Sequence, residues 1–229
     1  MTAVTVHHLD HSRSQRVLWL LEELEQPYAI EQHRRNPKTW RAPASLRAVH
    51  PLGKAPVVVL TEDDGSEIVL AESGAILEHL VETFADGRLT PPPGTAEARR
   101  HRFFLHWAEG SMMPPLVMKL ILSKVKSAPM PFFVRLIAKG IVKKVDDVFT
   151  DKEIRAHLDF LESELGDRPF FCGDALTAAD IQLSFPLDAA AARGGLERHR
   201  RLRAFVERIH ARPAYQRALS RGGPYDLAR

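Results

Sequence analysis

The apolar positions near the start of the chain follow a strand, helix, strand order. Apolar and polar residues alternate from Ala3 to His8, as they do in a half-buried strand. A helix is predicted from Ser12, and Pro27 ends it. The apolar residues of this helix recur on one face, at Val17, Leu20, Leu21 and Leu24. A second strand is expected at about residues 28–33.

A β-hairpin and another helix are predicted next. The apolar runs Val57–Leu60 and Glu67–Leu70 flank the turn pair Asp64-Gly65. Ser73 is the predicted N-cap of a helix whose apolar face comprises Leu77, Leu80, Val81 and Phe84. The order βαβ followed by ββα predicts a thioredoxin-like α/β unit with a four-stranded mixed sheet.

Beyond residue 85 the pattern is helical almost throughout. Residues 86–94, DGRLTPPPG, contain three consecutive prolines and are typical of a linker, so we expect domains at 1–85 and 95–229, the second all-helical. Helices are expected over about 95–110, 116–122, 132–148, 151–165 and 202–209. Met112 to Pro115 should interrupt or kink the first of them, and Asp151 should cap the fourth.

The last third of the chain carries further boundary signals. Thr177, with Asp180 three residues later, predicts a capping box, and Pro186 should kink the helix that it starts. Pro213 should end the last long helix, leaving only a short turn over Tyr215–Leu219 before a frayed tail.

Composition excludes several classes of function. The 32 basic and 29 acidic residues are intermixed and give a net charge of only +3, which does not favour nucleic acid as a partner. No apolar run approaches the roughly 20 residues of a membrane span, and the N-terminus lacks a signal-like segment, so a cytoplasmic protein is expected. The basic middle region, with Lys119, Lys139 and Lys143 among its lysines, fits a solvated helical face better than a membrane surface.

Cysteine and histidine usage adds little chemistry. Cys172 is the single cysteine, so no internal disulfide can form, and a small buried filler is the favoured interpretation. His7 and His8 point to opposite faces of a strand, and His11 completes no ligand spacing with them, so no metal site is expected.

The start of the helix at Ser73 offers one site for a ligand. Free N–H groups and partial positive charge at a helix N-terminus favour an anion, and Glu72 beside them is suited to hold an amine. The zwitterionic end of an amino acid fits both. Pro56 opens the first hairpin strand, where a proline is tolerated, and a cis Ala55-Pro56 bond would mark a purposeful feature.

These residues resemble a known family. Gly53-Lys54-Ala55-Pro56 followed by Glu72-Ser73 is similar to the glutathione site of the cytosolic glutathione transferases. The resemblance implies that the backbone of Ala55, before a cis Pro56, pairs with the cysteinyl part of glutathione. It also implies that Glu72-Ser73 holds the γ-glutamyl end and that Lys54 meets the glycyl carboxylate.

The candidate for the chemistry is Ser12, at the passage from the first strand to the first helix. The run Ser12 to Arg16 resembles the Ser-x-x-x-Arg opening of the serine-type members, among an outlying bacterial and fungal group, which implies that Ser12 donates a hydrogen bond to the glutathione sulfur. Ser14 is a rival donor, and on the residues alone Ser12 also fits a plain helix cap. Lowering a thiol pKa from about 8.5 by ~2 units corresponds to roughly 2.7 kcal/mol.

The resemblance extends over essentially the whole chain and includes the capping box of the helical domain. It implies a glutathione transferase that uses glutathione as co-substrate, forms a homodimer and conjugates a small hydrophobic electrophile. Trp107, Met112 and Met113 are candidates for the apolar wall of the electrophile site, with plain core packing as the alternative. Two further alternatives are a glutathione-dependent peroxidase or reductase and a non-catalytic binding or regulatory protein.

Overall fold

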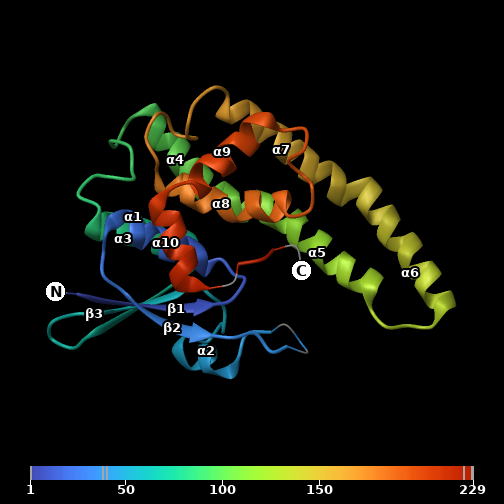
Figure 1. The fold of residues 1–229 in the computed structure, drawn as a ribbon, viewed down its shortest axis with the longest axis horizontal. Helices are drawn as coiled ribbons and strands as arrows, with labels where there is room; N and C mark the ends of the chain where they lie inside the picture. Colours follow the sequence, from blue (N-terminus) through green and yellow to red (C-terminus); the bar gives the residue numbers. More distant parts are fainter. Residues whose placement is uncertain (1, 38, 40, 224, 228–229) are drawn as a thin grey trace.

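A four-stranded mixed sheet forms the base of the N-terminal half (Figure 1). The computed structural model describes residues 2–37, 39, 41–223 and 225–227. The strand order is β2-β1-β3-β4, with β1 parallel to β2 and the other neighbours antiparallel. The strands are β1 (Ala3–Leu9), β2 (Ala29–His33), β3 (Val57–Thr61) and β4 (Glu67–Ala71). The predicted thioredoxin-like unit is confirmed.

The register of the sheet follows from its apolar residues. Val6 pairs with Ile30 on one side and with Val58 on the other, and Val58 pairs in turn with Leu70. Val6 and Val58 are fully buried. A slip of one residue would turn these side chains to the opposite face of the sheet, so the burial of one face specifies the register.

Three helices accompany the sheet. Helices α1 (Ser14–Leu24) and α3 (Ser73–Phe84) pack against each other above it, and α2 (Ala44–Val49) lies on its other side (Figure 1). The sequence pattern predicted only an irregular segment where α2 forms. This helix is six residues long and buries only Leu46, so it leaves almost no apolar periodicity.

The second half is helical. It comprises α4 (Ala96–Trp107), the π-helical segment η1 (Ala108–Met112), α5 (Met113–Ser127), α6 (Phe132–Val145), the π-helical segment η2 (Asp146–Thr150), α7 (Asp151–Leu165), α8 (Ala178–Ala191), α9 (Arg200–His210) and α10 (Pro213–Gly222). Helices α5 and α6 form a hairpin that projects from the body of the molecule (Figure 1). No helix in the described residues is long and apolar enough to cross a membrane.

Of two predicted features in this half, one is found and one is wrong. The expected interruption near Met112 takes the form of η1, a π-helical segment that separates α4 from α5, and the two prolines follow it in the first turn of α5. Asp151 caps no helix, because η2 continues directly into α7 and Thr150 before it has helical angles. Each junction is a π-helical turn, which local sequence signals do not reveal.

Helix α8 is the centre of the helical half, and its start was predicted correctly. Thr177 donates to Asp180 through its backbone N and its hydroxyl, both at 2.8 Å, completing the capping box. Helix α8 is buried on almost every side and runs unbroken through Pro186. Cys172 is buried nearby, and burial raises the pKa of its thiol to about 12, in keeping with a filler that stays protonated.

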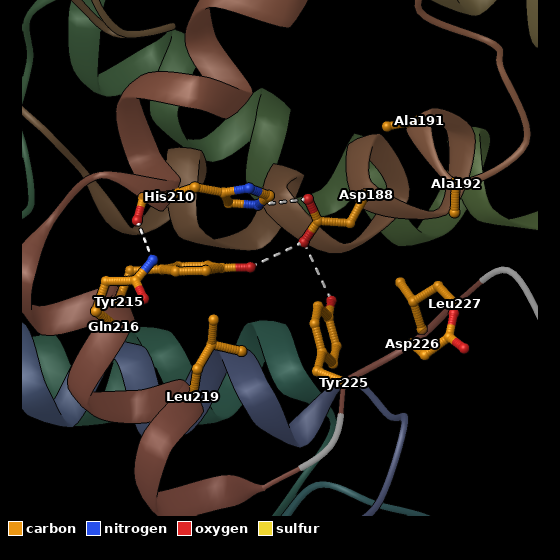
Figure 2. A pocket seen from close by; sticks show the side chains of 10 residues that line it. All are labelled: Asp188, Ala191, Ala192, His210, Tyr215, Gln216, Leu219, Tyr225, Asp226 and Leu227. Atoms are coloured by element: carbon orange, nitrogen blue, oxygen red, sulfur yellow. Dashed lines mark hydrogen bonds and ion pairs between the residues drawn. The ribbon is translucent and has the colours of Figure 1, made fainter.

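Residues 213–223 and Tyr225 are more ordered than the sequence indicates. The expected short turn is part of the ten-residue helix α10, which packs along α1. Instead of fraying, Tyr225 packs against Phe185 of α8. Figure 2 shows Tyr225, Tyr215 and His210 converging on the carboxylate of Asp188, at 3.2, 3.3 and 2.9 Å. These contacts join residues far apart in sequence, so a local pattern cannot predict them.

Candidate active site

A small cavity of about 180 Å³ lies where the loop before β3 meets the start of α3. It brings the Lys54–Pro56 segment together with Glu72 and Ser73, as the resemblance implied. Its lining comprises Arg13, His50, Leu52, Lys54, Ala55, Pro56, Ala71, Glu72, Ser73 and Glu109. The Ala55-Pro56 peptide bond is cis.

The backbone at Glu72 is strained. Its φ of 70° and ψ of 119° lie outside the regions that a residue with a Cβ ordinarily adopts. Such strain persists only where the surrounding structure enforces it, and it concentrates at ligand sites. Glu72 immediately precedes α3, whose first N–H groups have no acceptor within the helix.

Ser73 has a different role from the predicted N-cap. It is the first residue of α3, the N-cap position belongs to Glu72, and no side chain caps the helix. The Ser73 hydroxyl instead accepts hydrogen bonds from Arg16 Nη1 at 3.1 Å and from Gln182 Nε2 at 3.2 Å. Ser73 therefore links α1, α3 and α8 at the edge of the small cavity.

Glu109 binds two arginines at the boundary between the two halves. Arg13 Nε donates to both of its oxygens, at 3.0 and 2.9 Å, and Arg16 Nη1 donates to Oε1 at 2.5 Å. Arg16 is 1% exposed, and its guanidinium lies over the ring of Phe185. Burial alone would raise the pKa of Glu109, but the two guanidinium groups hold it below its ordinary value, so the carboxylate stays ionised.

Glu109 was missed in the sequence. The one available signal was a carboxylate inside the apolar stretch HWAEGSMMPP, and nothing in that stretch indicates arginines from the first helix as partners. The pairing is created by the contact of α1 with η1.

The two candidate serines differ in their surroundings. Ser14 is fully buried, and its Oγ lies 2.9 Å from His8 Nδ1, 3.3 Å from the Leu9 carbonyl and 3.2 Å from the Leu9 N–H, which donates to it. Ser12 is 5% exposed and lies between His11 and Arg13. Its Oγ accepts from the Ser14 N–H at 3.2 Å and lies 2.8 Å from Ser14 Oγ.

Helix α1 begins at Ser14 with Arg13 as its N-cap, two residues later than predicted. The bond from the Ser14 N–H to Ser12 Oγ nevertheless has the pattern of a cap, so the hydroxyl of Ser12 helps to end the loop before α1. Burial lowers the pKa of the neighbouring His8 to about 4, which leaves its imidazole neutral at pH 7.

A larger cavity, of about 630 Å³, adjoins the small one, because Arg13 lines both. Most of its wall is apolar and comes from α5, α8 and the C-terminal segment, through Met113, Leu116, Val117, Leu120, Ile121, Val125, Ala128, Phe185, Ala189 and Leu227. Of the three residues proposed for this wall, Met113 lines the cavity. Met112 is fully buried in the core, and Trp107 packs against Phe103, Phe160 and His157 instead.

No group of three or more metal-binding side chains occurs within the described part of the chain. The site therefore consists of a ligand-sized cavity at a helix start, a serine at a strand-to-helix passage and an adjoining apolar cavity. The class of protein is therefore one in which a thioredoxin-like domain is joined to a helical domain and a ligand cavity of the first adjoins an apolar cavity of the second.

Comparison with known proteins names the family. The family model for the N-terminal domain of glutathione S-transferase matches residues 12–83, and the model for the C-terminal domain matches residues 149–208. The chain belongs to the glutathione S-transferase family of enzymes.

Individual relatives include named glutathione S-transferases and one protein with a different name. The chain is 36% identical over 189 residues to glutathione S-transferase 1 of Saccharomyces cerevisiae, covering 82% of this chain and 80% of that protein. It is 29% identical over 181 residues to FtsZ-localized protein A of Caulobacter vibrioides, covering 77% and 72%. A solved glutathione S-transferase from Actinobacillus pleuropneumoniae superposes with a TM-score of 0.78 at 30% identity, covering 99% of this chain and 96% of that one.

Proposed function

We propose that this protein conjugates the thiolate of glutathione to a small electrophile with an apolar surface. The observation that carries the proposal is the convergence of Lys54–Pro56 with Glu72-Ser73 on one small cavity that shares Arg13 with a large apolar one. A thiol held at the boundary between them would face an apolar ligand directly, and this proximity accelerates the reaction.

In this proposal each end of glutathione would have a partner in the small cavity. The Glu72 carboxylate would bind the α-amino group, and the first N–H groups of α3 would bind the neighbouring α-carboxylate. The backbone of Ala55, next to Pro56, would pair with the cysteinyl part, and Lys54 with the glycyl carboxylate. In this proposal residues 1–85 bind glutathione, 86–94 link the halves and 95–229 supply the electrophile site.

Ser12, rather than Ser14, is the proposed hydrogen-bond donor to sulfur. Ser14 Oγ is fully buried among His8, Leu9 and Ser12, so no position around it remains for a ligand. Ser12 Oγ accepts from the Ser14 N–H and can take a second hydrogen bond from Ser14 Oγ, which leaves its own O–H for the sulfur.

The reaction needs little else from the protein. A thiolate stabilised by the Ser12 hydroxyl attacks the electrophilic carbon with a sulfur lone pair. In a substitution, the leaving group departs with its bonding pair. In an addition to an activated double bond, the electron pair moves to the neighbouring carbon, which takes a proton from water.

Substituting Ser12 tests this assignment. We expect Ser12→Ala to raise the pKa of the bound thiol by ~2 units and to lower kcat about 10²-fold while glutathione binding persists, because only the thiolate loses a donor. Ultraviolet absorbance of the thiolate against pH, calorimetry with glutathione and turnover of an aryl halide measure these effects. Ser184→Ala is the matched control, because that serine is buried in α8 outside both cavities. An unchanged thiol pKa in Ser12→Ala would show the assignment to be wrong.

A second candidate is a family member that binds glutathione but has lost turnover and acts as a binding or regulatory partner. The relative named FtsZ-localized protein A favours considering it. Heat of binding with glutathione, but no conjugation of any electrophile in a broad panel, would support this candidate over the enzyme.

We also propose that two copies form a homodimer. The support is a row of exposed apolar side chains on α6, which a second copy would cover: Phe132, Phe133, Leu136, Ile137 and Ile141. A mass of one subunit in solution at micromolar concentration would contradict the dimer.

A further inference from the structure

The large cavity combines an apolar wall with a positively charged rim. Its volume of about 630 Å³ is in the range of small-molecule sites, and α5 and α8 supply most of its apolar surface. The charged side chains that line it are the basic Arg13, Arg35, Lys124 and Arg193 and the acidic Asp226. Four basic residues and one acidic residue line the cavity, and the Glu109 carboxylate that binds Arg13 reduces the formal surplus from three positive charges to two.

The basic residues come from four separate segments, so the surplus is not the solvated face of one helix. Arg13 is held by Glu109, and Arg35 donates through Nε to the Asp10 carbonyl at 3.1 Å. Lys124 lies on α5, and Arg193, just beyond α8, donates to the Ala189 carbonyl at 3.0 Å. Positive groups converging on a cleft with low-dielectric walls raise the local concentration of anions.

Neither a purely apolar nor a purely polar ligand satisfies this cavity. An apolar molecule would contact the wall formed by residues such as Leu116, Leu120 and Phe185 but would form no ionic interaction with the basic rim. A small polar anion would meet the rim and leave the wall in contact with water, forgoing roughly 0.8 kcal/mol for each methylene that could be buried. A molecule with an apolar body and an anionic group would contact the wall with the first and the rim with the second.

We propose that the electrophile is an amphipathic anion, with an apolar body of several carbons and one carboxylate. This inference rests on the proposed function and specifies its substrate class. The apolar body lies along α5 and α8, the carboxylate lies at the rim near Lys124 and Arg193, and the electrophilic carbon lies toward Arg13, where the two cavities meet. For an α,β-unsaturated aldehyde, sulfur adds to the β-carbon and the α-carbon takes a proton from water.

Binding tests the inference without requiring turnover. Decanoate and decanol, which share an alkyl chain, are titrated into the full chain by calorimetry in low and in moderate salt. We expect decanoate to bind about tenfold more tightly in low salt and the preference to shrink as salt is added, because charges at the rim are screened. Equal affinities for the two ligands, or a preference that salt does not change, would overturn the proposal.

Variants locate the carboxylate. Lys124→Gln, alone and combined with Arg193→Gln, should lose most of the preference for decanoate and keep the affinity for decanol. Lys126→Gln is the matched control, because Lys126 is exposed on the same helix and does not line the cavity. A loss of preference equal to that of the control variant would refute the assignment to this rim.

A turnover experiment separates this inference from the proposed function. The substrates are two medium-chain 2-alkenals that differ only at the far end, one with a carboxylate and one with its methyl ester. We expect kcat/KM with glutathione to favour the carboxylate about fivefold or more. Conjugation that favours the ester would overturn the substrate class and leave the transferase intact. Binding of decanoate without any heat of binding for glutathione would overturn the proposed transferase function and leave the anion-binding cavity intact.

Discussion

The two cavities are built in different ways. The small one is formed by a loop, a cis peptide, a strained residue and the first turn of a helix, so its shape depends on backbone that the fold holds in place. The large one is formed by side chains on the faces of two helices and a short C-terminal segment. Backbone geometry suits one fixed ligand, whereas the large cavity can change by substitution without altering the fold.

The two cavities meet at one charged cluster. Glu109 comes from the helical half, Arg13 and Arg16 come from the sheet half, and the network extends through Ser73 to Gln182 on α8. Both halves therefore contribute residues to this charged cluster, which we call the joint. The predictions below test how far the halves depend on that joint and on their own interiors.

The largest effect is expected from removing the joint. Glu109→Ala leaves the almost fully buried Arg16 without its carboxylate, and we expect the free energy of unfolding to fall by about 3–5 kcal/mol. Denaturant titration measures the loss. Glu164→Ala is the control, because the Arg100–Glu164 pair is about a third exposed on each side and should contribute 1 kcal/mol or less. Equal losses in the two variants would show that the two halves do not depend on this cluster.

Acid should destabilise both halves in the same pH window. Burial lowers the pKa of His8, beneath α10, and of His101, on α4, to about 4. The unfolded chain, with an ordinary pKa near 6.5, takes up these protons first as pH falls. The contribution of each histidine to the free energy of unfolding should therefore drop by on the order of 2–3 kcal/mol between pH 6.5 and 4 and level off below that window.

Variants separate the two contributions. His8→Gln and His101→Gln should each flatten the acid slope of the free energy of unfolding by their share, and the exposed His106→Gln on α4 should leave it as it is. Urea titrations from pH 7 to pH 4 measure the slopes. A slope that neither buried-site variant changes would rule out these histidines as the source of acid sensitivity.

A smaller effect should show that the cavities bind independently. Glu72→Gln keeps the shape of the side chain and removes its charge, so we expect glutathione to bind about 2 kcal/mol more weakly, with decanoate unaffected. Leu120→Ala, in the wall of the large cavity, should weaken decanoate several-fold and leave glutathione unaffected. If both variants weaken the same ligand, the two cavities do not act separately.

Much of this fold could be predicted because its signals are local. The alternation at Ala3–His8, the Asp64-Gly65 turn and the Thr177/Asp180 capping box each act within a few residues, and each forms as expected. The errors arose at features that local rules do not reveal. The π-helical segment η2 continues into α7, so Asp151 caps no helix, and Tyr225 is held by the distant Asp188 instead of fraying.

The sequence by itself determined the sheet half, its family and the part of the small cavity formed by Lys54–Pro56 and Glu72-Ser73, because a glycine-lysine-alanine-proline turn and a glutamate-serine pair shape the backbone where they stand. Only the tertiary structure decided that Glu109 joins the two halves and that Ser14 is fully enclosed while Ser12 lies between His11 and Arg13, which line the large cavity. It also decided that Met113 lines the apolar wall while Met112 and Trp107 pack elsewhere. The physical reason is that these roles depend on which helix faces meet, and helix packing is set by side chains far apart along the chain.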